Sequence, residues 1–260
     1  MKYSYYQNKK KPPVGEVTDE EVVNIIRHDE KLAHMTLDIR QHLTANDIAT
    51  ADFIKGELPS VTFSARFIGG RRYDKLIEYN GEIPIDLDKK TPEELARISA
   101  AVTRSPFTHI SFTSPKGNGY KLTVQTSLPD GTLPQSPEEV RNYHAHAYDQ
   151  VAALYEELCQ TDIDESGKDM TRICYLPHDE NAYLNPAPQF LIVDLNRPLR
   201  EKKKKTPGRK KAAAATTDTT RCKKPSDNIS YPQSESRSLL ALLLYLSLIH
   251  ISEPTRRVVI

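Results

Sequence analysis

The spacing of apolar positions changes near residue 58 of the chain. Before that point apolar residues recur with helical spacing, as in TDEEVVNIIR from Thr18, where valines and isoleucines follow an acidic first turn. We therefore expect residues 1–57 to form a helical N-terminal part of the domain. After it, apolar residues alternate with polar or small ones, as in SVTFSARFI from Ser60. This alternation is typical of β-strands.

Residues 58–199 are predicted to form an α+β core. The predicted elements are a strand at 83–88, a helix at 91–102, strands from 109 and 121, a helix at 136–158 and a strand from 170. Each helix begins with a capping box, Thr-Pro-Glu-Glu or Ser-Pro-Glu-Glu. The order β-α-β-β-α-β predicts a ferredoxin-like or RRM-like fold. In this fold an antiparallel sheet of strand order 4-1-3-2 carries both helices on one face.

This topology brings distant polar segments to one edge of the sheet. Asp86 and Asp88 stand at the carboxyl end of the first strand, which lies beside the amino ends of the third and fourth strands. The turn at 114–119 and the loop TDIDESGKD before the fourth strand reach the same edge. We therefore expect any functional site to lie there.

The carboxylates of this edge suggest a metal. Residues two apart in a strand point to the same face, so Asp86 and Asp88 lie side by side while Leu87 points to the opposite face. Adjacent carboxylates repel each other unless a cation lies between them, and hard oxygen ligands favour Mg²⁺ or Mn²⁺. The alternative is a solvated polar face.

The turn SPKGNGYK suggests a phosphate site. Its glycines allow backbone N–H groups to approach a phosphate, while its lysines supply positive charge. The candidate nucleotide-binding residues are Ser114, Lys116, Gly117, Asn118, Gly119 and Lys121. The alternative is an ordinary hairpin turn, for which Asn-Gly is already a sufficient signal.

The segment before the last predicted strand offers a third group. Asp164 could complete the carboxylate set as a catalytic and metal-binding residue, with Asp162 as the other candidate. Arg172 could hold a triphosphate through its planar guanidinium. The alternative is a polar loop with no function.

Composition and charge limit the class of protein. The chain has 260 residues, of which 38% are hydrophobic and 27% are charged, which excludes collagen, a coiled coil and wholesale disorder. The net charge of +1 hides an asymmetry. Residues 1–199 carry 22 Lys and Arg against 30 Asp and Glu, a balance of −8, whereas residues 200–224 carry 11 against 2, a balance of +9.

The C-terminal part is expected to differ from the body. Residues 200–245 are predicted to be a basic flexible linker, either a solvated tether or a phosphate-binding segment. The stretch LSLIHISEPTR resembles an in-frame translation of a sequencing adapter, so we expect residues 246–260 to be non-native and a downstream region to be missing. The apolar run LLALLLYL is too short for the ~20 residues of a membrane span. Three cysteines without C-x-x-C spacing favour a reducing cytoplasm over a disulfide framework or a zinc site.

Three blocks of the sequence resemble a known family. They are YNGEIPIDLDKK, SFTSPKGNGYKLTV and IDESGKDMTRICYLPHDENAYLNP. In order and spacing they resemble the N-terminal domain of virulence-associated-protein-E-like proteins of bacterial mobile elements, of the BT4734-like type. That domain is similar to the catalytic core of the archaeo-eukaryotic primase, or primase-polymerase, superfamily. The resemblance covers roughly residues 55–195.

The resemblance implies roles for particular residues. Asp86 and Asp88 match the first carboxylate motif of the superfamily, and Asp164 matches the third. The second motif usually ends in a histidine, where this chain has Lys121. A lysine can hold a phosphate as a point charge but offers no imidazole. In similar proteins the domain often precedes a helicase-like ATPase.

These observations lead to one hypothesis and two competitors. The hypothesis is a nucleotidyltransferase of mobile-element DNA replication, which uses two metal ions to join a nucleoside triphosphate to a primer 3′-hydroxyl on DNA. The first competitor is a noncatalytic module that binds DNA or a nucleotide. The second is a structural adaptor whose carboxylates are merely solvated.

Overall fold

Three antiparallel strands form the centre of the fold, which the computed structural model describes for residues 1–163 and 168–200. β8 (Tyr120–Ser127) lies between β6 (Glu82–Leu87) and β7 (Thr108–Thr113). This confirms the neighbours predicted for the first three core strands. Two short strands complete this sheet. β10 (Tyr183–Leu184) pairs with β7, and β11 (Leu191–Ile192) pairs in parallel with the end of β8.

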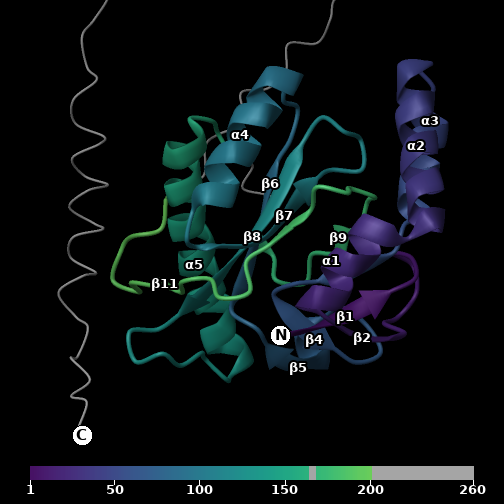
Figure 1. Ribbon diagram of the computed structural model, residues 1–260. Coiled ribbons are helices and arrows are strands. Elements are labelled where there is room, and N and C mark those ends of the chain that lie inside the picture. The colour runs from purple at the N-terminus through teal and green to yellow at the C-terminus, as the bar shows by residue number, and fades with distance from the viewer. Residues whose placement is uncertain (164–167, 201–260) are drawn as a thin grey trace, which may run out of the picture. The chain divides into compact units, whose positions relative to one another are not determined.

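Two capped helices cover one face of this sheet. α4 (Pro92–Arg104) and α5 (Pro137–Cys159) begin at the predicted capping boxes, where Thr91 accepts a hydrogen bond from the Glu94 amide and Ser136 accepts one from the Glu139 amide. Both helices lie on the same side of the sheet (Figure 1). Their apolar faces pack on β6 and β8 in a core that contains Ile83, Ile85, Leu87, Leu122 and Val124.

The opposite face of the sheet is also covered, by a layer built from the N-terminal segment. α1 (Asp19–His28), α2 (Glu30–Thr44) and α3 (Ile48–Glu57) lie on this side (Figure 1). They pack with Ile110 and Phe112 of β7 in a second core. The sheet is therefore buried between two layers.

The apolar spacing predicted a helical N-terminal segment, but this segment is helical only in part. It begins with β1 (Lys2–Tyr6) and β2 (Gly15–Thr18), which form a hairpin. β1 also pairs with β3 (Ser60–Thr62), more than fifty residues later in the chain. The local pattern does not reveal these strands because β1 is stabilised by a distant partner. A further hairpin, β4 (Ala65–Phe67) with β5 (Leu76–Tyr79), encloses a short 3₁₀ turn at Tyr73–Lys75.

The last predicted core strand occupies a different place. Only Cys174–Tyr175 of the segment from Met170 is a strand, β9, and it pairs with β3 rather than with β6. The second sheet therefore has the order β2-β1-β3-β9. The physical reason is that a strand's alternating pattern specifies a buried face but not its partner, and β3 offers its edge to β9. The described chain is a mixed α+β fold with antiparallel sheets and five helices.

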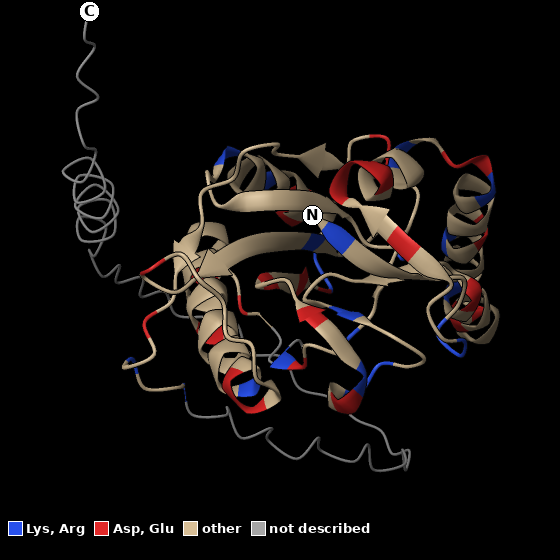
Figure 2. Ribbon diagram, turned by 90° about the horizontal axis from the view of Figure 1, so that it is seen from below, with Lys and Arg blue, Asp and Glu red and all other residues tan. Residues whose placement is uncertain are grey.

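All described residues belong to one compact unit. Lys and Arg are interspersed with Asp and Glu over its ribbon (Figure 2). None of its described helices combines the length and the apolarity that crossing a bilayer needs. The predicted linker beyond Arg200 and the predicted non-native segment at 246–260 lie outside the described residues.

A buried polar network joins the two layers through the sheet. His109 Nδ1 lies 2.9 Å from Glu82 Oε1, and His109 Nε2 lies 3.2 Å from Asp19 Oδ2. Glu82 also accepts a hydrogen bond of 2.5 Å from the Tyr3 hydroxyl. Burial lowers the pKa of His109, but the hydrogen bond and charge of Glu82, together with Asp19, outweigh it and raise that pKa above its ordinary value. The imidazolium therefore links β7 to β6 and α1.

This network predicts a pH dependence of stability. Because the folded protein raises the pKa of His109, the stabilisation is fully present below the ordinary histidine pKa of about 6.5 and is lost as the pH rises through the raised value. The free energy of unfolding, measured with urea across this window, should therefore fall toward alkaline pH. His109→Gln should lack this decline, and an equal decline in the variant would contradict the assignment.

Candidate functional site

A cavity of about 410 Å³ opens where β6 ends and β8 begins. Segments far apart in the sequence contribute to it, namely α3, the end of β6, the turn at 114–119 and the chain around β9. The lining residues are Lys55, Asp86, Asp88, Lys89, Ser114, Pro115, Lys116, Asn118, Lys121, Arg172, Ile173 and Tyr175. The sheet edge predicted from the topology is therefore the edge that carries the cavity.

Asp86 forms the central ion pair of the cavity. The register of β6 and β8 places it directly opposite Lys121, whose ammonium donates a hydrogen bond to Asp86 Oδ1. Arg172 Nη2 donates to the other oxygen, Asp86 Oδ2, at 3.3 Å. The side chains of Asp86 and Lys121 are 21% and 13% exposed, so water screens the pair only partly.

Burial and charge oppose each other in this pair. Burial raises the pKa of Asp86, but the charges of Lys121 and Arg172 outweigh it, so the pKa lies below its ordinary value. Burial lowers the pKa of Lys121, whereas the charge of Asp86 raises it to a value above the ordinary one. Both groups are consequently ionised at neutral pH.

Asp88 lies beyond the end of β6 and is exposed. Leu87 between the two carboxylates is fully buried in the core under α4 and α5, which confirms the predicted alternation. Gly119 approaches this edge so closely that a Cβ there would lie 2.9 Å from Asp88 Oδ1 and 3.0 Å from both the Leu87 carbonyl and Ser114 Oγ. A larger residue at this position would require the Asp88 side chain, the Ser114 hydroxyl and the Leu87 carbonyl to shift.

The turn at 114–119 presents side chains rather than its glycine amides. The amide of Gly117 donates to the Ser114 carbonyl at 2.9 Å, and neither glycine lines the cavity. Gly117 has φ +77°, which favours glycine. Ser114 lines the cavity, and its buried hydroxyl has no hydrogen-bond partner among the described residues.

Several lining residues were not among the sequence-based candidates. Lys55 comes from α3, and its ammonium lies 5.6 Å from the centre of the Tyr175 ring. Burial and the charges of Lys121 and Lys116 lower the pKa of Lys55. No local motif marks this lysine, because only the packing of α3 against β9 brings it to the cavity. The other additions are Lys89, Pro115, Ile173 and Tyr175.

The cavity lining is cationic. Five Lys or Arg side chains line it, against the two carboxylates Asp86 and Asp88. Lys116 also pairs with Asp52 of α3 at 2.7 Å. This excess of positive charge stands in a body whose balance is −8. A lining of this kind suits a polyanion such as a chain of phosphates.

The third predicted carboxylate cannot be placed. Asp164 lies outside the described residues. Within residues 1–163 and 168–200, no three His, Cys, Asp or Glu side chains gather closely enough to hold a metal ion. The residues that the structure brings together at the cavity are Asp86, Asp88, Ser114, Lys116, Asn118, Lys121 and Arg172.

The comparison with known families decides the family of the chain. The family described as BT4734-like, N-terminal domain, matches residues 54–184, which is half of the chain. The chain belongs to this family. All residues that line the cavity fall inside the matched range. No curated protein and no solved structure matches the chain. The match confirms the family resemblance seen in the sequence.

The close approach at Gly119 yields a prediction about stability. Gly119→Ala should reduce the free energy of unfolding by about 1–3 kcal/mol, because the added Cβ forces backbone and carboxylate apart. The matched control is Gly70→Ala, since a Cβ at Gly70 meets no atom within 4 Å. Urea denaturation of both variants measures the difference. Equal stability of the two would contradict the packing described here.

Proposed function

We propose that this domain binds a nucleoside triphosphate in the cavity and transfers its nucleotidyl group to a strand 3′-hydroxyl, with release of pyrophosphate, in the DNA replication of mobile elements. The observation that carries the proposal is the assembly of five cations and two carboxylates, from four separate segments, around one cavity. Its volume of about 410 Å³ suits a small molecule.

The phosphate chain would occupy the cationic side. Lys121 and Arg172 would exchange their contacts with Asp86 for contacts with phosphate oxygens. Lys55 of α3 and Lys116 of the turn would add positive charge. The unpartnered hydroxyl of Ser114 would donate to a phosphate oxygen. Ile173 and Tyr175 line the same cavity and would contact the base or sugar.

The carboxylate side fits a divalent ion that enters with the nucleotide. Mg²⁺ is usually held by one or two carboxylates together with substrate phosphates, and Asp86 and Asp88 provide that number. Asp164 is proposed as a third ligand from outside the described residues. When bound, Mg²⁺ or Mn²⁺ would neutralise charge on the phosphates and lower the pKa of the attacking hydroxyl.

The order of events follows from the ion pair. Asp86 holds Lys121 and Arg172 in place before substrate arrives. Phosphates that draw these cations away would leave the Asp86 carboxylate unpaired, so that it could help Asp88 to hold a divalent ion. The ion pair thus keeps both groups charged and oriented without either being buried alone, which would cost several kcal/mol.

The fold is compatible with this proposal. β6, α4, β7, β8 and α5 follow one another in the order β-α-β-β-α, which supports a ferredoxin-like or RRM-like arrangement. We propose that the domain is a variant of the primase-polymerase core in which β9 has joined the N-terminal sheet. In a longer protein a helicase-like ATPase would follow the domain, and the whole would act on DNA in the cytoplasm.

A second candidate function rests on Lys121. A lysine that is paired with the central carboxylate would bind phosphate without catalysing transfer. The domain would then hold DNA or a nucleotide and deliver it to another protein. Binding and transfer experiments separate the two candidates.

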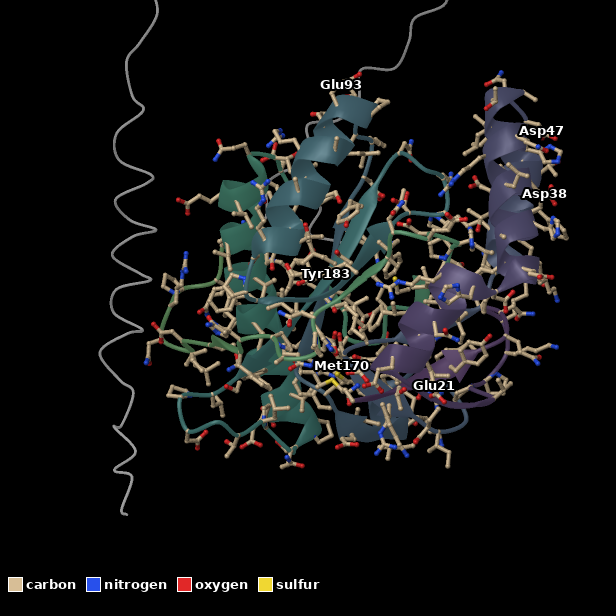
Figure 3. All side chains as sticks on the ribbon, in the orientation of Figure 1. Glu21, Asp38, Asp47, Glu93, Met170 and Tyr183 are labelled. Carbon is tan, nitrogen blue, oxygen red and sulfur yellow. The ribbon has the colours of Figure 1, made fainter. Side chains whose placement is uncertain are left out.

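The phosphate site is tested by removing charge from each side of the ion pair. In EDTA, Lys121→Ala should bind inorganic triphosphate about tenfold or more weakly, since a hydrogen bond to a charged group contributes roughly 1.5–3 kcal/mol. Asp86→Asn should bind it more tightly, because the internal competitor is gone. Titration calorimetry measures both. Asp38→Asn, at the outer edge of the α2–α3 pair (Figure 3), is the control. Unchanged affinities in both cavity variants would contradict the site.

Transfer is tested by primer extension with labelled nucleotides and Mn²⁺. The wild-type chain should extend a primer, and Asp86→Ala should lower the rate by about 100-fold or more, equivalent to roughly 2.7 kcal/mol of transition-state stabilisation. Circular dichroism confirms that the variant is folded. Undiminished synthesis by Asp86→Ala would contradict the catalytic assignment. A wild-type chain that binds triphosphate but extends nothing would support the second candidate.

A further inference from the structure

Beside the cavity lies a group of cations that the proposed function does not use. Lys9, Lys10 and Lys11 belong to the loop between β1 and β2, and Arg71 belongs to the loop between β4 and β5. We call these four residues the basic rim. The three lysines are exposed, and the rim lies outside the residues that line the cavity.

Contacts connect the basic rim to the cavity on two sides. Arg71 donates to the Lys9 carbonyl at 3.4 Å and to the Thr171 carbonyl at 3.3 Å, next to Arg172 of the cavity. The Lys9 ammonium lies 3.3 Å from the position that a Cβ of Gly56 would take, next to Lys55 of the cavity. The rim therefore continues the positive surface of the cavity outward.

Most of this charge is not neutralised. Lys10 pairs with Glu57 at 4.0 Å. Among the described residues, Lys9, Lys11 and Arg71 have no carboxylate within 4.0 Å. In a body with a balance of −8, such a group of unpaired cations is an attractive surface for an anionic chain.

We propose that the basic rim binds the phosphodiester backbone of a single nucleic-acid strand whose end reaches the cavity. This rests on the proposed function, which needs a strand end at the nucleotide. A single strand is favoured because the cavity that the rim adjoins contains an aromatic ring, Tyr175, whose centre lies 5.6 Å from the Lys55 ammonium. Cationic grooves with aromatic side chains are typical of single-strand binding. The three lysines precede the matched residues 54–184, whereas Arg71 lies within them.

The salt dependence of binding tests the rim. Fluorescence anisotropy of labelled oligo(dT) with the full chain gives the slope of log K against log salt. Lys9→Ala/Lys11→Ala should weaken binding and reduce that slope by about 1.4, since each phosphate contact to a single strand contributes about 0.7. The control is Arg104→Ala/Arg197→Ala, which removes two exposed cations outside the rim. Identical slopes in the rim and control variants would overturn the proposal.

A local measurement separates the rim from other cations in the chain. Lysine acetylation, read by mass spectrometry, should slow severalfold at Lys9 and Lys11 when oligo(dT) is added but remain unchanged at Lys2, whose side chain is 64% exposed. Equal labelling of these lysines with and without oligo(dT) would overturn the proposal. So would loss of binding to phosphatidylserine vesicles in the rim variant while its oligo(dT) affinity is retained.

Failure of the rim and failure of the cavity give different results. The rim variant should retain wild-type affinity for inorganic triphosphate, because neither lysine lines the cavity. If that affinity persists while the rim variant binds oligo(dT) like the wild type, only the rim proposal is wrong. If the wild-type chain binds no triphosphate but Lys9 and Lys11 are still protected, only the cavity proposal is wrong.

Discussion

The antiparallel pairing of β6 with β8 is the constraint on which the site depends. It sets Asp86 opposite Lys121 on one face of the sheet, while Leu87 and Leu122 point into the core under the helices. A slip of one residue would bury the charged pair and expose the leucines, so the hydrophobic core enforces the register of the site. A largely buried ion pair contributes little net free energy to folding, because desolvation offsets the attraction. Removing either partner would nevertheless leave a costly buried charge.

Burial of the sheet on both faces explains how charge is concentrated. Because α4 and α5 cover one face and the N-terminal layer covers most of the other, the charged side chains of β6 and β8, together with His109 of β7, fall in two places. One is the fully paired network around Glu82 and His109, which joins the layers. The other is the cavity, where cations outnumber carboxylates. In the network, Glu82 and His109 are bonded to each other and to Tyr3 and Asp19. The cavity therefore suits a ligand better than the network does.

The N-terminal layer contributes to the cavity as well as to the core. Lys55 of α3 lines the cavity, and Arg40 of α2 lies behind the turn, with its guanidinium 3.5 Å from the Ser114 carbonyl. Asp52 of α3 pairs with Lys116 of the cavity. Arg40 and Asp52 precede the range matched by the family. The family domain and the residues before it therefore build the site together.

Local chemistry was sufficient to predict much of this protein. Capping boxes locate α4 and α5, alternation locates β6, β7 and β8, and a two-residue spacing sets Asp86 and Asp88 apart from Leu87, because these signals act within a few residues. The helical reading of residues 1–57 missed β1 and β2, and the last core strand was assigned to the wrong sheet. Pairing partners such as β1 with β3 and β9 with β3 are long-range choices that no local pattern encodes. For the same reason only the tertiary structure brought Lys55 and Tyr175 to the cavity and joined Lys9 to Arg71.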